Sequence, residues 1–224
     1  MRTAWSGLFR ASAMALALAG CGGAGGGGGG GAGGGATVGG DSAAATSLPA
    51  AMRPVTVARG LQASPDHALI VVLSPSDGGP YAIVDASGAI VAEVGPRDRA
   101  LIDATPGTVT YYALADSAGD RISGEVVAGG VYYAAVDPHG SGIHFVTVSP
   151  RSADGRWDHL SELIGETEEQ EIDPAQRGAL DAHVVTPQLR PRMSALDTRA
   201  GEMDAAHLDE RTLHPEEGSL TPPQ

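Results

Sequence analysis

The chain has 224 residues and a formal net charge of −13, with 27 acidic residues against 14 arginines and no lysine. This imbalance excludes binding to nucleic acid or to anionic lipid headgroups through charge. The single cysteine leaves no disulfide framework, and the length accommodates one domain with extensions.

Residues 1–21 have the pattern of an export signal. Arg2 and Arg10 precede an apolar run, residues 11–19, which is far shorter than the roughly 18–20 residues that span a bilayer. Leu18-Ala-Gly-Cys21 follows and resembles the lipobox of bacterial lipoproteins; the alternative is a chance cysteine after an ordinary signal. The resemblance implies cleavage before Cys21, lipidation of its sulfur and stable anchoring by several acyl chains. By analogy with enteric lipoproteins, Gly22 favours the outer membrane.

Residues 22–50 are expected to form a flexible Gly/Ala-rich tether. Residues 22–40 contain 14 glycines in 19 positions, without the period of collagen and without the lysine of a phosphate loop. About 30 residues of such coil span on the order of 30 Å, which holds a domain clear of a lipid surface.

Residues 51–153 alternate short β-branched and aromatic runs with turn residues. Asp85-Ala-Ser-Gly88 predicts a hairpin, and Gly129-Gly130 suits a two-residue primed hairpin turn. With no helix between the runs, the pattern predicts a mainly β fold: an antiparallel β-sandwich of about seven to eight short strands with a C-terminal helical extension. The expected strands are residues 68–73, 81–84, 89–94, 99–104, 108–115, 122–128, 131–137 and 143–149, with a short edge strand at 54–57.

Several turn and strand motifs resemble those of PEGA-type β-sandwich domains, which occur in small bacterial lipoproteins of undefined function. The motifs are the Val84-Asp85…Gly88 hairpin, the Thr-Pro-Gly step from Thr105 to Tyr111, and the Ala-Gly-Gly-Val-Tyr-Tyr strand from Ala128 to Tyr133. The resemblance covers residues 66–150. It implies a sandwich fold with an accessory role and carries no catalytic residue onto this chain.

Beyond the β domain, residues 154–186 are expected to form an acidic helical extension. Trp157, Leu160, Leu163 and Ile164 recur at helical spacing and predict a helix that docks on the sandwich. A second helix is expected from Asp173-Pro174 to about Val185. Residues 187–224 hold five prolines and no aromatic residue, so a largely disordered tail is expected, with one weak helix starting near Ser194.

The cluster most like a site is Asp137, His139 and His144, which surround Gly140-Ser-Gly142. Loop imidazoles and a carboxylate are zinc ligands, but the spacing matches no established zinc motif. The alternative is a polar hairpin loop with solvated histidines, which we favour. Ser141 lies outside the Gly-x-Ser-x-Gly pattern of hydrolase nucleophiles.

The acidic link, residues 166–171, admits acid–base chemistry or calcium binding, but a run of carboxylates is more often a solvated face. Neighbouring residues of a strand point to opposite faces, so one ring of each tyrosine pair, 111–112 and 132–133, is expected in the core and the other at the surface. Tyr112, Tyr132 and Trp157 are therefore the candidate contacts for a ligand or partner.

Together these patterns predict an exported, lipid-anchored protein of the bacterial envelope whose β-sandwich is a non-enzymatic binding or accessory module. The membrane is contacted through the lipid on Cys21, and the partner is an envelope protein or cell-wall glycan. No catalytic residue, metal or cofactor is expected. The competing prediction is an envelope-polymer hydrolase or metal-dependent enzyme built on Asp137, His139 and His144.

Overall fold

The computed structural model describes residues 52–55, 60–115, 118–175 and 189–219. All of these belong to one compact unit, residues 43–224. The expected signal segment, Cys21 and the tether lie outside the described residues, as does most of the helix expected at residues 174–185. None of the helices in the described ranges has the length and apolar character needed to cross a membrane.

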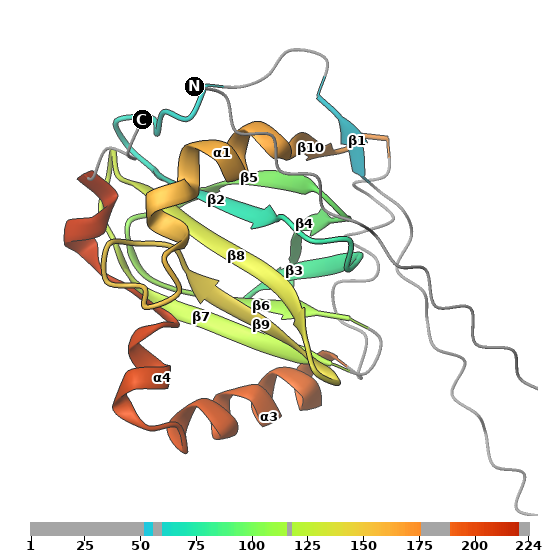
Figure 1. The fold of residues 1–224 in the computed structure, drawn as a ribbon, viewed down its shortest axis with the longest axis vertical. Coiled ribbons are helices and arrows are strands. Elements are labelled where there is room, and N and C mark those ends of the chain that lie inside the picture. The colour runs from blue at the N-terminus through green and yellow to red at the C-terminus, as the bar shows by residue number, and fades with distance from the viewer. Residues whose placement is uncertain (1–51, 56–59, 116–117, 176–188, 220–224) are drawn as a thin grey trace, which may run out of the picture. The chain divides into compact units, whose positions relative to one another are not determined.

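The fold is mainly β, with two packed sheets (Figure 1). Sheet A has the order β1 (Met52–Pro54), β10 (Glu168–Ile172), β5 (Asp98–Ala104), β2 (Ala68–Ser74), β8 (Val131–His139) and β9 (Gly142–Thr147). Sheet B has the order β11 (Thr212–Leu213), β7 (Gly119–Val126), β6 (Gly107–Leu114), β3 (Tyr81–Asp85) and β4 (Ile90–Val94). The eight strands expected between residues 68 and 149 are thus confirmed as β2–β9, but β1, β10 and β11 raise the number of strands above the seven to eight expected.

The expectation that the sandwich is purely antiparallel is wrong, because both sheets are mixed. β2 pairs with β8, β10 with β5 and β11 with β7 in parallel. The Gly129-Gly130 turn does not close a hairpin; it carries the chain from β7 in sheet B to β8 in sheet A. The Asp85 hairpin is confirmed, and the carboxylate of Asp85 accepts hydrogen bonds from the backbone N–H groups of Ser87 and Ala89 at 2.9 and 3.0 Å.

Apolar side chains fill three layers rather than one. The largest core lies between the sheets and includes Ile70, Tyr132 and Phe145. Two further clusters cover the outer faces, under helices that lie on opposite sides of the sandwich. The 3₁₀ turn η1 (Arg156–His159) and α1 (Leu160–Glu166) cover sheet A, and α3 (Leu189–Gly201) covers sheet B. The expected docking of the helix through Trp157 and Leu160 is therefore confirmed.

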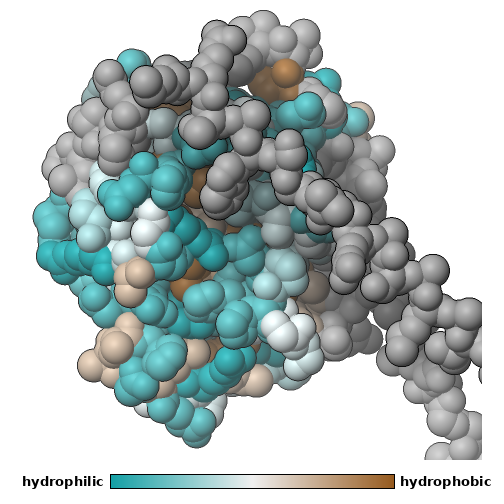
Figure 2. All heavy atoms as spheres, in the orientation of Figure 1, coloured by the Kyte–Doolittle hydropathy of each residue, from teal (hydrophilic) through white to brown (hydrophobic). Residues whose placement is uncertain are grey.

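Coverage of both outer faces explains why β2 is buried along its whole length. On the face shown in Figure 2, the described residues are mostly hydrophilic, and the hydrophobic areas are small and separate. This face of the sandwich is therefore mainly polar, and among the described residues the exposed large hydrophobic side chains are Val127 and Leu208.

Two expectations for the C-terminal part are wrong. The expected acidic helical extension is in part a strand, because residues 168–172 form β10 between β1 and β5, although Glu166, Glu168 and Glu171 remain exposed as a solvated run of carboxylates would be. The expected disordered tail is ordered from residue 189 to 219 as α3, α4 (Ala205–Asp209), β11 and the 3₁₀ turn η2 (Pro215–Ser219). This segment, residues 189–219, is called the C-terminal segment below.

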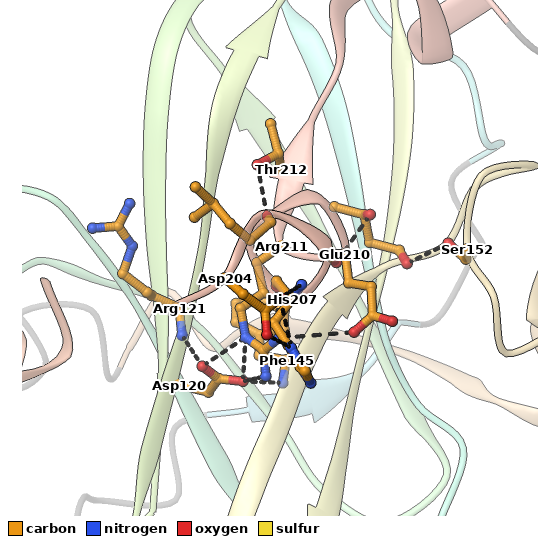
Figure 3. A network of polar contacts seen from close by, with 11 residues as sticks. Asp120, Arg121, Phe145, Ser152, Asp204, His207, Glu210, Arg211 and Thr212 are labelled. Atoms are coloured by element: carbon orange, nitrogen blue, oxygen red, sulfur yellow. Dashed lines mark hydrogen bonds and ion pairs between the residues drawn. The ribbon is translucent and has the colours of Figure 1, made fainter. Parts of the chain in front are cut away.

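A buried ion pair joins the C-terminal segment to the sandwich. Asp120 in β7 is 1% exposed, and Arg211, between α4 and β11, is 6% exposed. The Arg211 Nε lies 3.1 Å from both carboxylate oxygens of Asp120, and Nη2 lies 3.0 Å from Oδ2. The same carboxylate accepts the backbone N–H of Arg121 at 3.0 Å and that of Phe145 in β9 at 2.9 Å (Figure 3).

This arrangement protects the outer edge of β9. The Asp120 carboxylate takes the N–H of Phe145, and the carbonyl of Glu210 accepts the N–H of Thr147 at 2.8 Å. An edge strand with free N–H groups invites pairing with another chain. Asp120 and the C-terminal segment therefore satisfy the N–H groups of β9, the last strand of sheet A, that no neighbouring strand pairs with.

We expect Asp120→Ala to lower the free energy of unfolding by about 3–5 kcal/mol, because it leaves the Arg211 guanidinium buried without its partner. Urea unfolding followed by circular dichroism measures the change. The matched control is Arg53→Ala, which breaks an exposed ion pair with Glu171 at 2.7 Å and should cost at most about 1 kcal/mol. Equal losses in the two variants would contradict a special role for the buried pair.

Candidate functional site

The candidate site lies on the outer face of sheet A, at the end of the β8–β9 hairpin. Asp137 and His139 alternate along β8 with the inward-facing Val136, and His144 lies directly opposite Asp137 in β9. The imidazoles of His139 and His144 have ring centres 5.3 Å apart and planes tilted by 41°. The structure thus brings together the three residues that the sequence singled out.

Arg156, which the sequence did not single out, pairs with two carboxylates of this face. Its Nη1 lies 2.6 Å from Oδ2 of Asp137, and its Nε lies 2.8 Å from Oδ2 of Asp154. The Asp137 carboxylate is therefore engaged by a guanidinium. Across the described ranges, no group of three or more His, Cys, Asp or Glu side chains is placed to hold a metal ion.

A small pocket of about 40 Å³ opens beside His144. It is lined by His144, Val146, Thr147, Ser152, Ala153, Asp154 and Glu210. Its volume holds about two or three water molecules, which is small for a sugar or peptide.

Both hydroxyl groups of this pocket make local hydrogen bonds. Ser152 Oγ donates to the carbonyl of Thr147 and accepts the N–H of Ser149, each at 2.9 Å. Thr147 Oγ1 donates to the carbonyl of Glu210 at 3.2 Å. A serine or threonine nucleophile is activated when a neighbouring base accepts its hydroxyl proton. The hydroxyls of Ser152 and Thr147 instead donate hydrogen bonds to backbone carbonyls, which are not bases of this kind.

His144 is half-buried, and burial lowers its pKa below the ordinary value of 6.5. The positive charge of Arg211 lowers the pKa further, and His139 and Arg156 act in the same direction. The Asp120 carboxylate opposes them without cancelling their effect. His144 is therefore a neutral imidazole at pH 7.

The expectation that one tyrosine of each pair faces solvent is wrong: all four rings are buried. Tyr112 lies under α3, and its hydroxyl donates to Asp197 Oδ1 at 2.9 Å; burial and this hydrogen bond raise its pKa to about 12. Tyr132 lies in the central core, and its hydroxyl donates to the carbonyl of Pro215 at 3.2 Å. Both rings hold the C-terminal segment, so neither is a surface contact.

Trp157 is partly exposed and packs edge-on against Tyr133, with ring centres 6.3 Å apart. It anchors η1 on sheet A and is the member of the predicted contact set with accessible ring surface. In the acidic link, Glu169 is buried beside Arg99, whose Nη2 lies 3.6 Å away, whereas Glu166, Glu168 and Glu171 are exposed. The buried Glu169 of β10 thus contacts Arg99 of β5 and helps to hold the two strands together.

Asp137, His139, His144 and Arg156 thus form a polar face on a β-sandwich whose outer faces are covered by helices. Comparison with known proteins could assign a role to this face. No protein-family model, curated protein or solved structure matches the chain, so the resemblance to PEGA-type domains stays a prediction.

The lowered pKa of His144 predicts how stability depends on pH. As the pH falls below 6.5, the residue at position 144 takes up a proton in the unfolded chain more readily than in the folded chain. Protonation therefore favours the unfolded state, and the stability present above pH 6.5 is lost as the pH falls through the pKa of His144 in the folded state. We expect the NMR titration of the His144 ring to have its midpoint below 6.5. The unfolding free energy of the wild type should fall more between pH 7 and pH 5 than that of His144→Gln. Parallel pH profiles for the two proteins would contradict the assignment.

Proposed function

We propose that this chain is a lipoprotein anchored to the bacterial cell envelope, most simply in the outer membrane, and that its β-sandwich is a non-enzymatic binding module. The pattern of residues 1–21, with Cys21 after an apolar run, supports the proposed location in the cell envelope. For the module, the supporting observation is that helices cover the apolar outer faces of both sheets, so that the face shown in Figure 2 is mainly polar.

The geometry at the β8–β9 hairpin supports binding over catalysis. A hydrolase needs an activated nucleophile or a metal-bound water next to a substrate cleft. Here Asp137 is held by Arg156, and Ser152 and Thr147 donate to carbonyls. Asp137, Ser152 and Thr147 therefore stabilise the fold through these contacts, and none of them is arranged as an activated nucleophile.

The burial of aromatic rings favours a protein over a glycan as partner. Sugar-binding surfaces commonly offer aromatic rings with an apolar face and a polar edge. In the described part of the chain, the tyrosines and Phe145 are buried, and Trp157 is engaged with Tyr133. We therefore propose an envelope protein as the partner.

The surface charge indicates which kind of protein surface would bind. Exposed carboxylates follow η1 and α1 over sheet A, at Asp158, Glu162 and Glu166. The exposed Glu171 of β10 is instead paired with Arg53 at 2.7 Å. Arg99, which lies beneath the end of α1, points inward, and its Nη1 donates to the Ile164 carbonyl at 2.9 Å. A partner with a basic surface is complementary to this side.

The anchor is tested by Cys21→Ser in cells supplied with a radiolabelled fatty acid. The wild type should take up label and be cleaved before residue 21, whereas the variant should remain an unlabelled precursor, because the lipid is attached to sulfur. Ser42→Ala, which lies outside the signal, is the control and should label as the wild type does. Label in the Cys21→Ser protein would overturn the lipoprotein assignment.

The binding side is tested by photo-crosslinking in intact envelopes, with a photoreactive amino acid at Glu166. We expect a discrete crosslinked protein whose yield falls as ionic strength rises, because exposed charges are screened by salt. The control position is Glu202, an exposed residue next to α3 on sheet B. Equal products at both positions would contradict the assigned side.

The same material tests the competing function. The purified chain should release no soluble fragments from isolated cell wall. Release that disappears in Asp137→Asn would replace the binding proposal by a hydrolase.

A further inference from the structure

His139 and His144 form a pair of neighbouring imidazoles that the proposed binding module does not use. They belong to adjacent strands of one hairpin, where His139 pairs with Gly142 and His144 pairs with Asp137. The backbone ladder therefore fixes the two positions relative to one another, and the ring centres lie 5.3 Å apart. His139 is exposed and His144 half-buried, so the pair is accessible from solvent.

This separation is the one that two imidazoles adopt around a shared metal ion. With nitrogen–metal distances of about 2.0–2.1 Å and a tetrahedral angle, the ring centres lie about 5 Å apart. Imidazole nitrogen is a preferred ligand of Zn²⁺, Cu²⁺ and Ni²⁺. We propose that His139 and His144 together bind one divalent transition-metal ion, as an exchangeable site on the outer face of sheet A.

The charges around the pair permit a dication. Arg156 is the adjacent cation, but it contacts two carboxylates, those of Asp137 at 2.6 Å and Asp154 at 2.8 Å. Glu210 adds a further carboxylate at the pocket beside His144. Glu210 faces Arg211, whose Nη1 lies 4.0 Å away and which is itself paired with Asp120, so four carboxylates stand against two guanidinium groups. This excess of negative charge attracts a metal ion, and the pocket has room for waters to complete its coordination.

The number of protein ligands determines the character of the site. A structural zinc site has four protein ligands and a catalytic one has three. Here the carboxylate that would be third, Asp137, is held by Arg156. Two imidazoles bind an ion reversibly, so the site takes up and releases metal instead of retaining a cofactor.

The test is titration of the purified full chain, made without a histidine tag, with Cu²⁺ followed by electron paramagnetic resonance and calorimetry. We expect one Cu²⁺ per chain with a spectrum of two nitrogen ligands. His139→Ala should weaken binding at least about 10-fold, the lower limit for loss of even an indirect contact to a metal, and leave one nitrogen in the spectrum. His139 is exposed at the hairpin, so the variant should melt as the wild type does.

The control is His207→Ala, because His207 is an exposed histidine whose Nδ1 lies 2.8 Å from Asp204 and is a competing surface site. It should leave affinity and spectrum unchanged. His144→Gln, which preserves side-chain volume, should match His139→Ala. Wild-type affinity in His139→Ala, or a single-nitrogen spectrum in the wild type, would overturn the proposal.

Discussion

The Asp120–Arg211 ion pair is the interaction on which the arrangement of the described chain depends. A buried carboxylate is costly unless its oxygens are paired, and here a guanidinium and two backbone N–H groups satisfy them. The contacts come from β7, β9 and the connection between α4 and β11. Because the pair tolerates little displacement, it fixes these elements relative to one another, which a purely apolar contact would do less specifically.

Around this pair, the C-terminal segment is attached by polar contacts more than by apolar burial. Asp197 of α3 accepts from Tyr112 and from Arg121, and Arg192 donates to the carbonyls of Ala115 and Ala118. α3 buries Leu189, Met193 and Ala200, a modest apolar area for 13 residues. Where β11 docks, Gly124 is needed because a side chain there would meet the Leu213 backbone at about 2.1 Å. The C-terminal segment is therefore held both by its polar contacts and by the close approach of backbones that Gly124 permits.

The strands could be predicted from the sequence because period-2 patterns and turn residues are local signals. Their pairing could not: Gly129-Gly130 suits a hairpin, yet only the distant partner β2 determines that β8 enters the other sheet. The order of the tail has no local signal in the sequence, because residues 187–224 lack aromatic residues and their contact with the central core is made by the aliphatic Leu213. Arg211 lies 91 residues from Asp120, and nothing local connects them.

The candidate site shows the same division. Asp137, His139 and His144 were found together because a short hairpin makes neighbours in sequence neighbours in space. The role of Arg156 was missed because it depends on where η1 returns to the sheet. Tyr112 and Tyr132 were misassigned since strand alternation tells which face a ring points to, but not whether a helix covers that face.

The wide separation of paired elements has a consequence for how the chain acquires its structure. β1 pairs with β10, β2 with β8 and β7 with β11, so sheet assembly depends on contacts between distant parts of the sequence. Such topologies fold slowly, because long loops must close before contacts stabilise them. Until Arg211 and Glu210 arrive, the outer edge of β9 has free N–H groups and Asp120 has no counter-ion. A slow approach to the native state makes the partly folded chain dependent on protection from aggregation during that interval.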